Sequence, residues 1–357
     1  MQVKKWILSV VSVVATGASW ASVPDNLGER LAQNYVQPAM AEFGDSASAL
    51  RHALHAWCAS HGKADMQPVQ SAFTRTVKAW GGIEFLRFGP LTQKNRFEKL
   101  AFWPDPRGVV QRQVRTLLAS KDPAALADGA LASRSVAMQG LPALEYVLYD
   151  SPGLLKTGAS TVFDSYACDY AVAVASNVSS IAGDLKQEWS ANSAFGNEFI
   201  HPSPANPLYR SQEEVAAEAV KALSTGLEFA RNVKLWPSLA DSAQKSRPRQ
   251  AAWWRSDLAL PTLIANVQGM KAFYEAGDYL YPASEAWIGS SFVGELNSAA
   301  TTLTALKGTW GELVANETDW GRLALVSLVL KNAKDLVDQH VAPALGVTIG
   351  FNALDGD

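Results

Sequence analysis

Apolar positions recur along this chain at the three- and four-residue spacing of amphipathic helices, and the alternating pattern of strands is scarce. Four series predict a helix running toward Glu84, a long helix ending near Trp189, a helix beginning at Leu258 and a last long helix before Pro343. The pattern therefore predicts an all-α protein. The series are Val69, Phe73, Val77 and Trp80; Val162, Tyr166, Tyr170 and Val174; Leu258, Thr262, Ala265 and Gly269; and Leu323, Val326, Leu330 and Leu336.

A stretch rich in Gly, Ser, Asn and Pro interrupts the helical pattern between Asn192 and Tyr209. Without the first 21 residues the chain would hold about 336 residues, more than a single hydrophobic core usually supports. We therefore expect two helical bundles, an N-terminal one over residues 22–200 and a C-terminal one over residues 201–357.

The first 21 residues have the order of a secretory signal peptide. Lys4 and Lys5 precede an apolar stretch over residues 6–15, and Ser19 and Ala21 place small residues where signal peptidase cleaves. A membrane anchor would need roughly 20 apolar residues, and this run is shorter and interrupted by polar ones. The pattern predicts a signal peptide over residues 1–21, a periplasmic or secreted location, and a protein that is not integral to the membrane.

The charge of the chain limits its partners. It carries 31 Lys and Arg against 34 Asp and Glu, and removing residues 1–21 takes away two lysines and no acid, so the formal net charge changes from −3 to −5. A mildly acidic chain with no basic run argues against nucleic acid or an anionic membrane surface as its partner.

Two cysteines, Cys58 and Cys168, are the whole cysteine content. In an exported protein, a distant pair is more often a disulfide than a metal or redox site, so we expect the two to be bridged. The alternative is a metal site, because His52, His55, Cys58 and His61 follow one another at intervals of three. His52 and His55 could share a metal on one helix face, but such a site would need Cys58 in the reduced form.

Two segments place charged residues beside helix breaks. AWGGIEFLRFGPL holds Glu84 and Arg87 between a Gly pair and a Gly-Pro step. The loop AFWPDPRG follows, with Trp103 and Asp105. Trp103 could line a ligand groove or fill the core of a bundle, and the sequence leaves both open.

A third segment, SVAMQGLPALEYVLYD, begins at Ser135 and contains a break before a carboxylate. Pro142 has no amide hydrogen and suits the first turn of a helix, so Gly140 and Pro142 predict a kink or a new start. Glu145 then lies one turn inside the new helix. It either faces a ligand or satisfies amides that the break leaves free.

These segments resemble the imelysin-like proteins. The resemblance rests on WGGIEFLRFGPL, FWPD, QGLPALEYVLY, the WRS of Trp254-Arg255-Ser256 and the terminal GVTIGFNALDGD, in that order. It implies two helical bundles from a duplicated arrangement, a periplasmic or surface location and an association with iron uptake. The ligand-binding candidates on these segments are Glu84, Arg87, Trp103, Asp105, Ser135, Gly140, Glu145, Arg255, Ser256 and Asp355.

The family was first described through a proposed metallopeptidase, and its hallmark is a Gly-x-His-x-x-Glu segment. Gly140 and Glu145 match this hallmark, but Pro142 occupies the histidine position. A zinc or iron site built on that His-x-x-Glu pair therefore cannot form. The carboxylates Glu84, Glu145 and Asp355 stay as metal candidates, and oxygen ligands suit Ca²⁺, Mg²⁺ or ferric iron better than zinc. A bound metal ion, iron or another divalent cation, is thus a hypothesis.

Two functions compete. The first is a non-enzymatic binding or accessory protein of iron or metal acquisition, with a small-molecule or metal ligand in a cleft between the bundles and outer-membrane or periplasmic iron-uptake components as partners. The second is a metallopeptidase-like hydrolase that uses Glu145 as general base. The missing histidine and the lack of a recognisable activated nucleophile favour the first.

Overall fold

The computed structural model of the 357-residue chain describes residues 23–127, 129–150, 153–155, 163–348 and 350. Every regular element in these ranges is a helix, which confirms the predicted all-α class. Within them, no helix combines the length and the apolar character that crossing a bilayer requires. The predicted signal segment, residues 1–21, and the candidate Asp355 lie outside the described residues.

Helices α1 to α8 come from the N-terminal part of the chain and α9 to α15 from the C-terminal part. One turn of π-helix joins α1 to α2, and others lead from α9 to α10 and from α14 to α15. The bounds are α1 Leu27–Leu31, α2 Gln37–Ala59, α3 Gln67–Ile83, α4 Arg96–Leu100, α5 Val109–Ser120, α6 Leu141–Tyr149, α7 Ser165–Glu188, α8 Ala194–Ile200, α9 Gln212–Glu228, α10 Trp236–Leu239, α11 Ala259–Gly277, α12 Trp287–Ala305, α13 Trp310–Ala315, α14 Glu317–Leu336 and α15 Ala342–Ala344.

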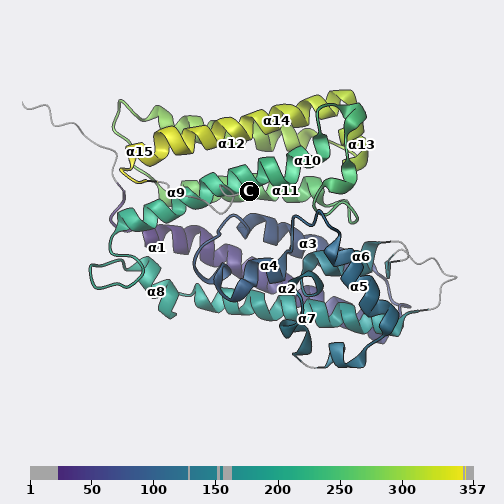
Figure 1. The fold of residues 1–357 in the computed structure, drawn as a ribbon. Helices are drawn as coiled ribbons and strands as arrows, with labels where there is room; N and C mark the ends of the chain where they lie inside the picture. Colours follow the sequence, from purple (N-terminus) through teal and green to yellow (C-terminus); the bar gives the residue numbers. More distant parts are fainter. Residues whose placement is uncertain (1–22, 128, 151–152, 156–162, 349, 351–357) are drawn as a thin grey trace, which may run out of the picture.

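The helices form two layers, with α9 to α15 above and most of α1 to α8 below in Figure 1. In the lower layer α2 packs against α3 and α7, and in the upper layer α12 packs against α14 and α11. The layers meet mainly where α3 lies on α11. The domain division predicted after residue 200 stays a prediction.

The predicted apolar faces are the buried faces. Val69, Phe73, Val77 and Trp80 are all fully buried on α3. The other three series are buried at Tyr170 and Val174 of α7, at Leu258, Thr262 and Gly269 on and before α11, and at Leu323, Val326 and Leu330 of α14. Tyr166, Ala265 and Leu336 are half-buried, and Val162 lies outside the described residues. Burial of these stripes drives the layers together, since each buried large aliphatic side chain contributes about 1.5–3 kcal/mol.

The stretch between Asn192 and Tyr209, predicted as a break, contains the short helix α8. Ser193 begins it by accepting a hydrogen bond from the Gly196 amide at 2.9 Å. Phe195 and Phe199 of α8 then pack edge-on against Trp189 at 4.8 and 5.2 Å between ring centroids. Aromatic packing therefore orders a segment whose composition favours a loop.

Glycines let α3 and α11 approach to backbone contact. A Cβ atom on Gly269 would lie 2.6 Å from the Gly82 carbonyl oxygen and equally close to the Tyr35 hydroxyl, and one on Gly81 would lie 2.9 Å from Thr262. Tyr35 uses the narrow space to donate a hydrogen bond to the Gly82 carbonyl at 2.5 Å. Only glycine fits at these positions, so the small residues seen in the third series mark the layer contact.

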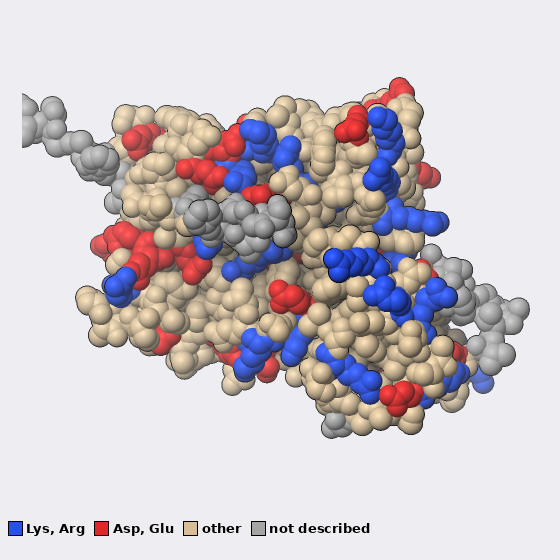
Figure 2. All heavy atoms as spheres, in the orientation of Figure 1, with Lys and Arg blue, Asp and Glu red and all other residues tan. Residues whose placement is uncertain are grey.

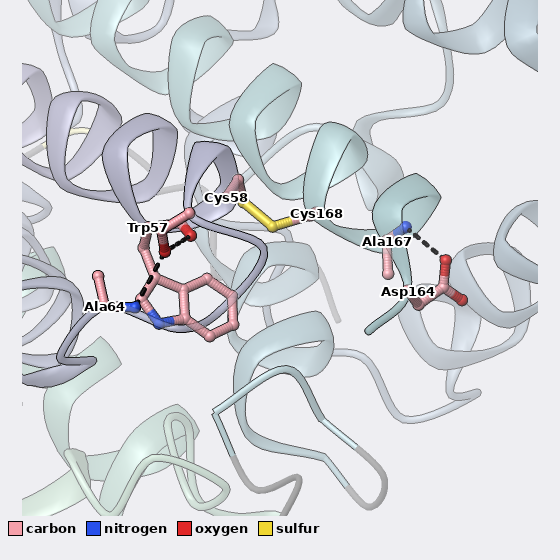
Figure 3. The surroundings of a disulfide bond; sticks show 7 residues. Trp57, Cys58, Ala64, Asp164, Ala167 and Cys168 are labelled. Atoms are coloured by element: carbon pink, nitrogen blue, oxygen red, sulfur yellow. Dashed lines mark hydrogen bonds between the residues drawn. A yellow bond between two sulfur atoms is a disulfide. The ribbon is translucent and has the colours of Figure 1, made fainter. Parts of the chain in front are cut away.

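A disulfide joins Cys58 near the end of α2 to Cys168 in the first turn of α7, as predicted (Figure 3). The two Cα atoms are 5.8 Å apart and 110 positions apart in the chain. Asp164 caps α7 beside the bridge, because its side chain accepts a hydrogen bond from the Ala167 amide at 3.2 Å. The bridge holds the ends of two neighbouring helices of the lower layer together and limits the freedom of the unfolded chain.

We expect Gly269→Ala to destabilise the protein by about 1–3 kcal/mol, because the added methyl group meets a backbone carbonyl that cannot turn away. Urea unfolding followed by circular dichroism measures the change. Gly321→Ala on α14 is the matched control: a Cβ atom there meets nothing within 4 Å, so replacing a mid-helix glycine should stabilise by up to about 1 kcal/mol. Equal effects of the two substitutions would contradict a close α3–α11 contact.

Candidate functional site

Helix α6 starts where the sequence predicted a break. Gly140 is its N-cap residue and Pro142 lies in its first turn, after a 3₁₀ turn over Val136–Met138. Gly140 is required by space, because a Cβ atom would lie 2.5 Å from the carbonyl oxygens of Lys99 and Leu100 at the end of α4. The break therefore lets α6 begin against α4 and brings its side chains to the junction of the layers.

Glu145 on α6 reaches across to the upper layer. Its Oε1 accepts hydrogen bonds from the Ser256 amide at 3.0 Å and from the Ser256 hydroxyl at 2.7 Å. Only 4% of Glu145 is exposed, and burial raises the pKa of its carboxyl, opposed by the Ser256 hydrogen bonds. This carboxyl group thus ties the lower layer to a turn of the upper one.

The turn that holds Ser256 has a strained backbone. Trp253 and Asp257 have φ values of 62° and 59°, in the left-handed region that residues other than glycine seldom adopt. Contacts on both sides hold the turn: Glu145 binds Ser256, and the Asp257 Oδ1 accepts a hydrogen bond from the Trp310 amide at the start of α13 at 2.7 Å. Residues 253–257 are therefore fixed between α6 and α13.

Arg255 projects from the same turn and forms a second tie across the junction. Its Nε lies 2.8 Å from the Asp150 Oδ1, with the two side chains 16% and 24% exposed. The guanidinium lies over the rings of Tyr146 and Trp254, at 5.2 and 4.4 Å from their centroids. The predicted site residues Glu145, Arg255 and Ser256 therefore come together, in an arrangement that also involves Asp150 and Tyr146.

Glu84 belongs to a different cluster, at the contact of α3 and α11. Its Oε1 pairs with Lys234 and accepts a hydrogen bond from Asn266 Nδ2 at 2.6 Å. Lys234 also donates to Asn266 Oδ1 at 3.0 Å. Burial lowers the pKa of Lys234, and the Glu84 charge opposes this. In this cluster the buried charges of Glu84 and Lys234 pair with each other, and both bind the side-chain amide of Asn266. The cluster therefore joins α3 to α11 through polar contacts.

Arg87 lies beside that cluster. Its guanidinium is 4.1 Å from the ring centroid of Phe97 and 4.0 Å from that of Phe229, so the lower and upper layers each supply one ring. Burial lowers the pKa of Arg87, opposed mainly by the charge of Glu84. Arg87 therefore contacts one aromatic ring of each layer.

The remaining candidates lie apart from both clusters. Asp105 caps α5, because its two carboxylate oxygens accept the Val109 and Val110 amides at 2.8 and 2.9 Å. Ser135 is exposed ahead of the 3₁₀ turn, and Trp103 is partly buried against the core. Asp105, Ser135 and Trp103 therefore lie outside the cluster around Glu145.

Four partners in these clusters were not identified from the sequence: Lys234, Asn266, Asp150 and Tyr146. Asp150 and Tyr146 lie in the segment already singled out: Tyr146 directly follows Glu145 on α6, and Asp150 is the C-cap residue of that helix. Lys234 follows Arg231 in the otherwise mostly apolar stretch FARNVKLW, where a cation that becomes buried needs a partner. Nothing in the local sequence marks Asn266.

Residues 36–339 match the family model described as Imelysin. The chain belongs to the imelysin family. No curated protein sequence matches it.

Two solved structures share the imelysin fold seen here. An imelysin-like protein from Psychrobacter arcticum 273-4 has a TM-score of 0.73 at 17% identity, covering 93% of this chain and 100% of that one. A putative iron-regulated protein A precursor from Parabacteroides distasonis ATCC 8503 has a TM-score of 0.68 at 12% identity, covering 90% of this chain and 97% of that one. At these identities the likeness concerns the fold.

The imelysin hallmark suggests a metal, and the residues present here do not fit one. Pro142 offers no ligand atom at the histidine position, and the Oε1 of Glu145 already accepts two hydrogen bonds. In the described ranges, no three or more His, Cys, Asp and Glu side chains gather closely enough to hold a metal ion. Cys58 is bonded to Cys168 and supplies no thiolate to the neighbouring histidines. The junction therefore offers a carboxyl, a hydroxyl and a guanidinium as its chemistry.

We expect Lys234→Met to destabilise this imelysin by about 3–5 kcal/mol, because it leaves the Glu84 charge buried without its partner. The double variant Glu84→Gln, Lys234→Met should recover much of that loss. Lys331→Met, in an exposed pair with Asp335 on α14, is the matched control and should change stability by no more than about 1 kcal/mol. Chemical unfolding of the parent and the three variants measures these changes. Similar losses of stability in Lys234→Met and Lys331→Met would contradict a buried Glu84–Lys234 pair.

We expect Glu145→Gln to become more stable relative to the parent as the pH rises. Because the folded protein holds the Glu145 proton more tightly than the unfolded chain, the contribution of this group to stability falls once the pH passes the ordinary pKa of 4.5 and approaches the raised one. Glutamine keeps an acceptor for Ser256 and does not titrate. Unfolding free energies at about pH 5 and about pH 8 measure the difference.

Glu145→Ala is the companion variant. It removes the acceptor of the Ser256 amide and should destabilise by about 1–3 kcal/mol at both pH values. A Glu145→Gln protein that loses stability relative to the parent at the higher pH would show that the ionised carboxylate is favoured at this position.

Proposed function

We propose that this imelysin is a non-enzymatic binding or accessory protein of iron or other metal acquisition, which acts outside the cytoplasm and holds its ligand at the junction of the two layers. The observation that carries the proposal is the strained turn over residues 253–257, fixed by Glu145 from one layer and by α13 of the other. Left-handed backbone at residues other than glycine concentrates at ligand sites, where the surrounding contacts hold it in place.

Three further observations support export, a role in iron acquisition and a ligand at the junction of the layers. The order of residues 1–21 favours export. The structural relative from Parabacteroides distasonis is described as an iron-regulated protein A precursor. Arg255 and Asp150 are partly exposed at the rim of the turn, so polar groups from both layers can meet a ligand there. A ligand that touches both layers would couple its binding to their relative position.

A second candidate is a hydrolase with Glu145 as general base. The raised pKa of Glu145 and its 2.7 Å hydrogen bond from the Ser256 hydroxyl favour it, because a carboxyl with a raised pKa beside a hydroxyl can take up a proton. Against it, Glu145 is 4% exposed and holds the Ser256 amide as well. The geometry therefore supports the binding role better.

Growth under iron limitation tests the proposal. In the organism that carries the gene, a deletion strain should grow more slowly and accumulate less iron than the parent when iron is scarce, and equally well when it is plentiful. Arg255→Gln should restore iron accumulation less well than the unchanged gene at equal protein level, because it removes the charged group at the rim. Lys331→Gln, far along α14 from the turn, should restore it fully.

Two outcomes would overturn this assignment. One is a deletion strain with unaltered iron accumulation under iron limitation. The other is a purified protein that hydrolyses peptides and loses that activity in Glu145→Gln, which would establish the hydrolase.

A further inference from the structure

A ladder of arginine side chains and aromatic rings leads away from the junction. The Arg249 guanidinium lies 5.4 Å from the ring centroid of Trp254, and the Arg255 guanidinium lies 4.4 Å from the same ring. Arg255 continues to Tyr146, 5.2 Å away on α6. We call Arg249, Trp254, Arg255, Tyr146 and Arg115 the arginine ladder.

Arg115 joins the ladder from α5. The pKa of Tyr146 is raised, mainly by burial, and the charges of Arg115 and Arg255 both act to lower it. The geometry agrees, because α5, which carries Arg115, packs against α6, which carries Tyr146. The ladder thus takes Arg115 and Tyr146 from the lower layer and Arg249, Trp254 and Arg255 from the upper layer.

Most hydrogen-bond donors of the ladder have no partner within the described part of the chain. The guanidinium of Arg255 donates from its Nε to Asp150, and its two terminal nitrogens make no hydrogen bond to a described residue. Arg115 and Arg249 are exposed, and each lacks a hydrogen bond or ion pair with any described residue. Stacking on the Trp254 ring limits the freedom of two of the guanidinium groups, so less entropy is lost when they bind a ligand.

The surroundings of the ladder are strongly positive in a chain whose net charge is negative. Residues 105–115 and 245–257 carry seven Lys and Arg against two Asp, whereas the whole chain has a formal charge of −3. Figure 2 shows Lys and Arg gathered at the right of this face, where α5, α6 and α13 lie in Figure 1. A local positive field attracts anions and repels a bare metal cation.

We propose that the arginine ladder binds a small polycarboxylate, either free or as the anionic complex of a metal ion. The planar guanidinium group presents paired N–H donors that match the two oxygens of a carboxylate. Guanidinium groups on separate elements can each take one carboxylate of the same molecule, which a ligand with a single carboxylate cannot do. This inference rests on the proposed function for its biological setting and gives the ligand a chemical class.

Calorimetric titration of the mature protein with citrate tests the ladder without iron. We expect citrate to bind, acetate to bind far more weakly, and added salt to weaken the interaction. Arg249→Gln and Arg115→Gln should each lower the affinity for citrate roughly tenfold or more, because each removes a charge-assisted contact. Lys186→Gln, an exposed cation near the end of α7 that pairs with Asp45, is the matched control and should leave the affinity unaltered.

Ferric citrate distinguishes the two sources of the ligand. Binding of citrate and ferric citrate with the same sensitivity to Arg249→Gln would show that the carboxylates are what the ladder recognises. The inference is overturned if folded protein binds no citrate, if Arg249→Gln and Arg115→Gln bind it as well as the parent, or if inorganic phosphate binds as tightly as citrate. Citrate binding in a protein whose deletion leaves iron accumulation unaltered would uphold the ladder and refute the iron role.

Discussion

The close contact of α3 with α11 is the constraint on which the rest of the structure depends. Glycines at positions 81 and 269 allow the two helices to meet closely, and the Tyr35 hydroxyl fills the narrow space that remains. At such a short separation a charged side chain between the layers must be paired within the protein. The Glu84–Lys234–Asn266 cluster meets this demand. The Arg87 guanidinium instead lies over two phenylalanine rings, and its Nε and one terminal nitrogen are buried without a hydrogen bond to any described residue.

This contact fixes the relative position of the layers and thereby forms the second junction, between α6 and the turn over residues 253–257. A buried carboxyl there holds an amide and a hydroxyl of the opposite layer, while the strained backbone of the turn places Arg255 toward the rim. The two junctions differ in how far solvent can reach their charged groups. Glu84 and Lys234 are buried, whereas Arg255 is partly exposed and Arg115 and Arg249 are exposed.

Pro142, which occupies the hallmark histidine position, fits a junction that is held by hydrogen bonds. Its fixed φ suits the first turn of α6, and the helix it starts directs Glu145 into a hydrogen-bonded tie with Ser256. With proline at this position, the chemistry of the junction is that of hydrogen bonds and positive charge. The arginine ladder is the part of that surface with donors to offer, so anion recognition is the function that this chemistry favours.

The sequence by itself determined the helical class, the family, the disulfide between Cys58 and Cys168 and the break before Glu145. Each of these depends on residue types and their order along the chain: a period of 3.6 residues, five short motifs, a pair of cysteines, or a glycine two positions before a proline. Only the tertiary structure decided that Glu84 pairs with Lys234, that Glu145 binds Ser256, and that Arg255 lies over the ring of Tyr146. These partners lie more than a hundred positions apart, and no local preference encodes which distant side chain meets which. Helix packing settles that question, because a buried carboxyl must find its donors wherever the close approach of the layers brings them.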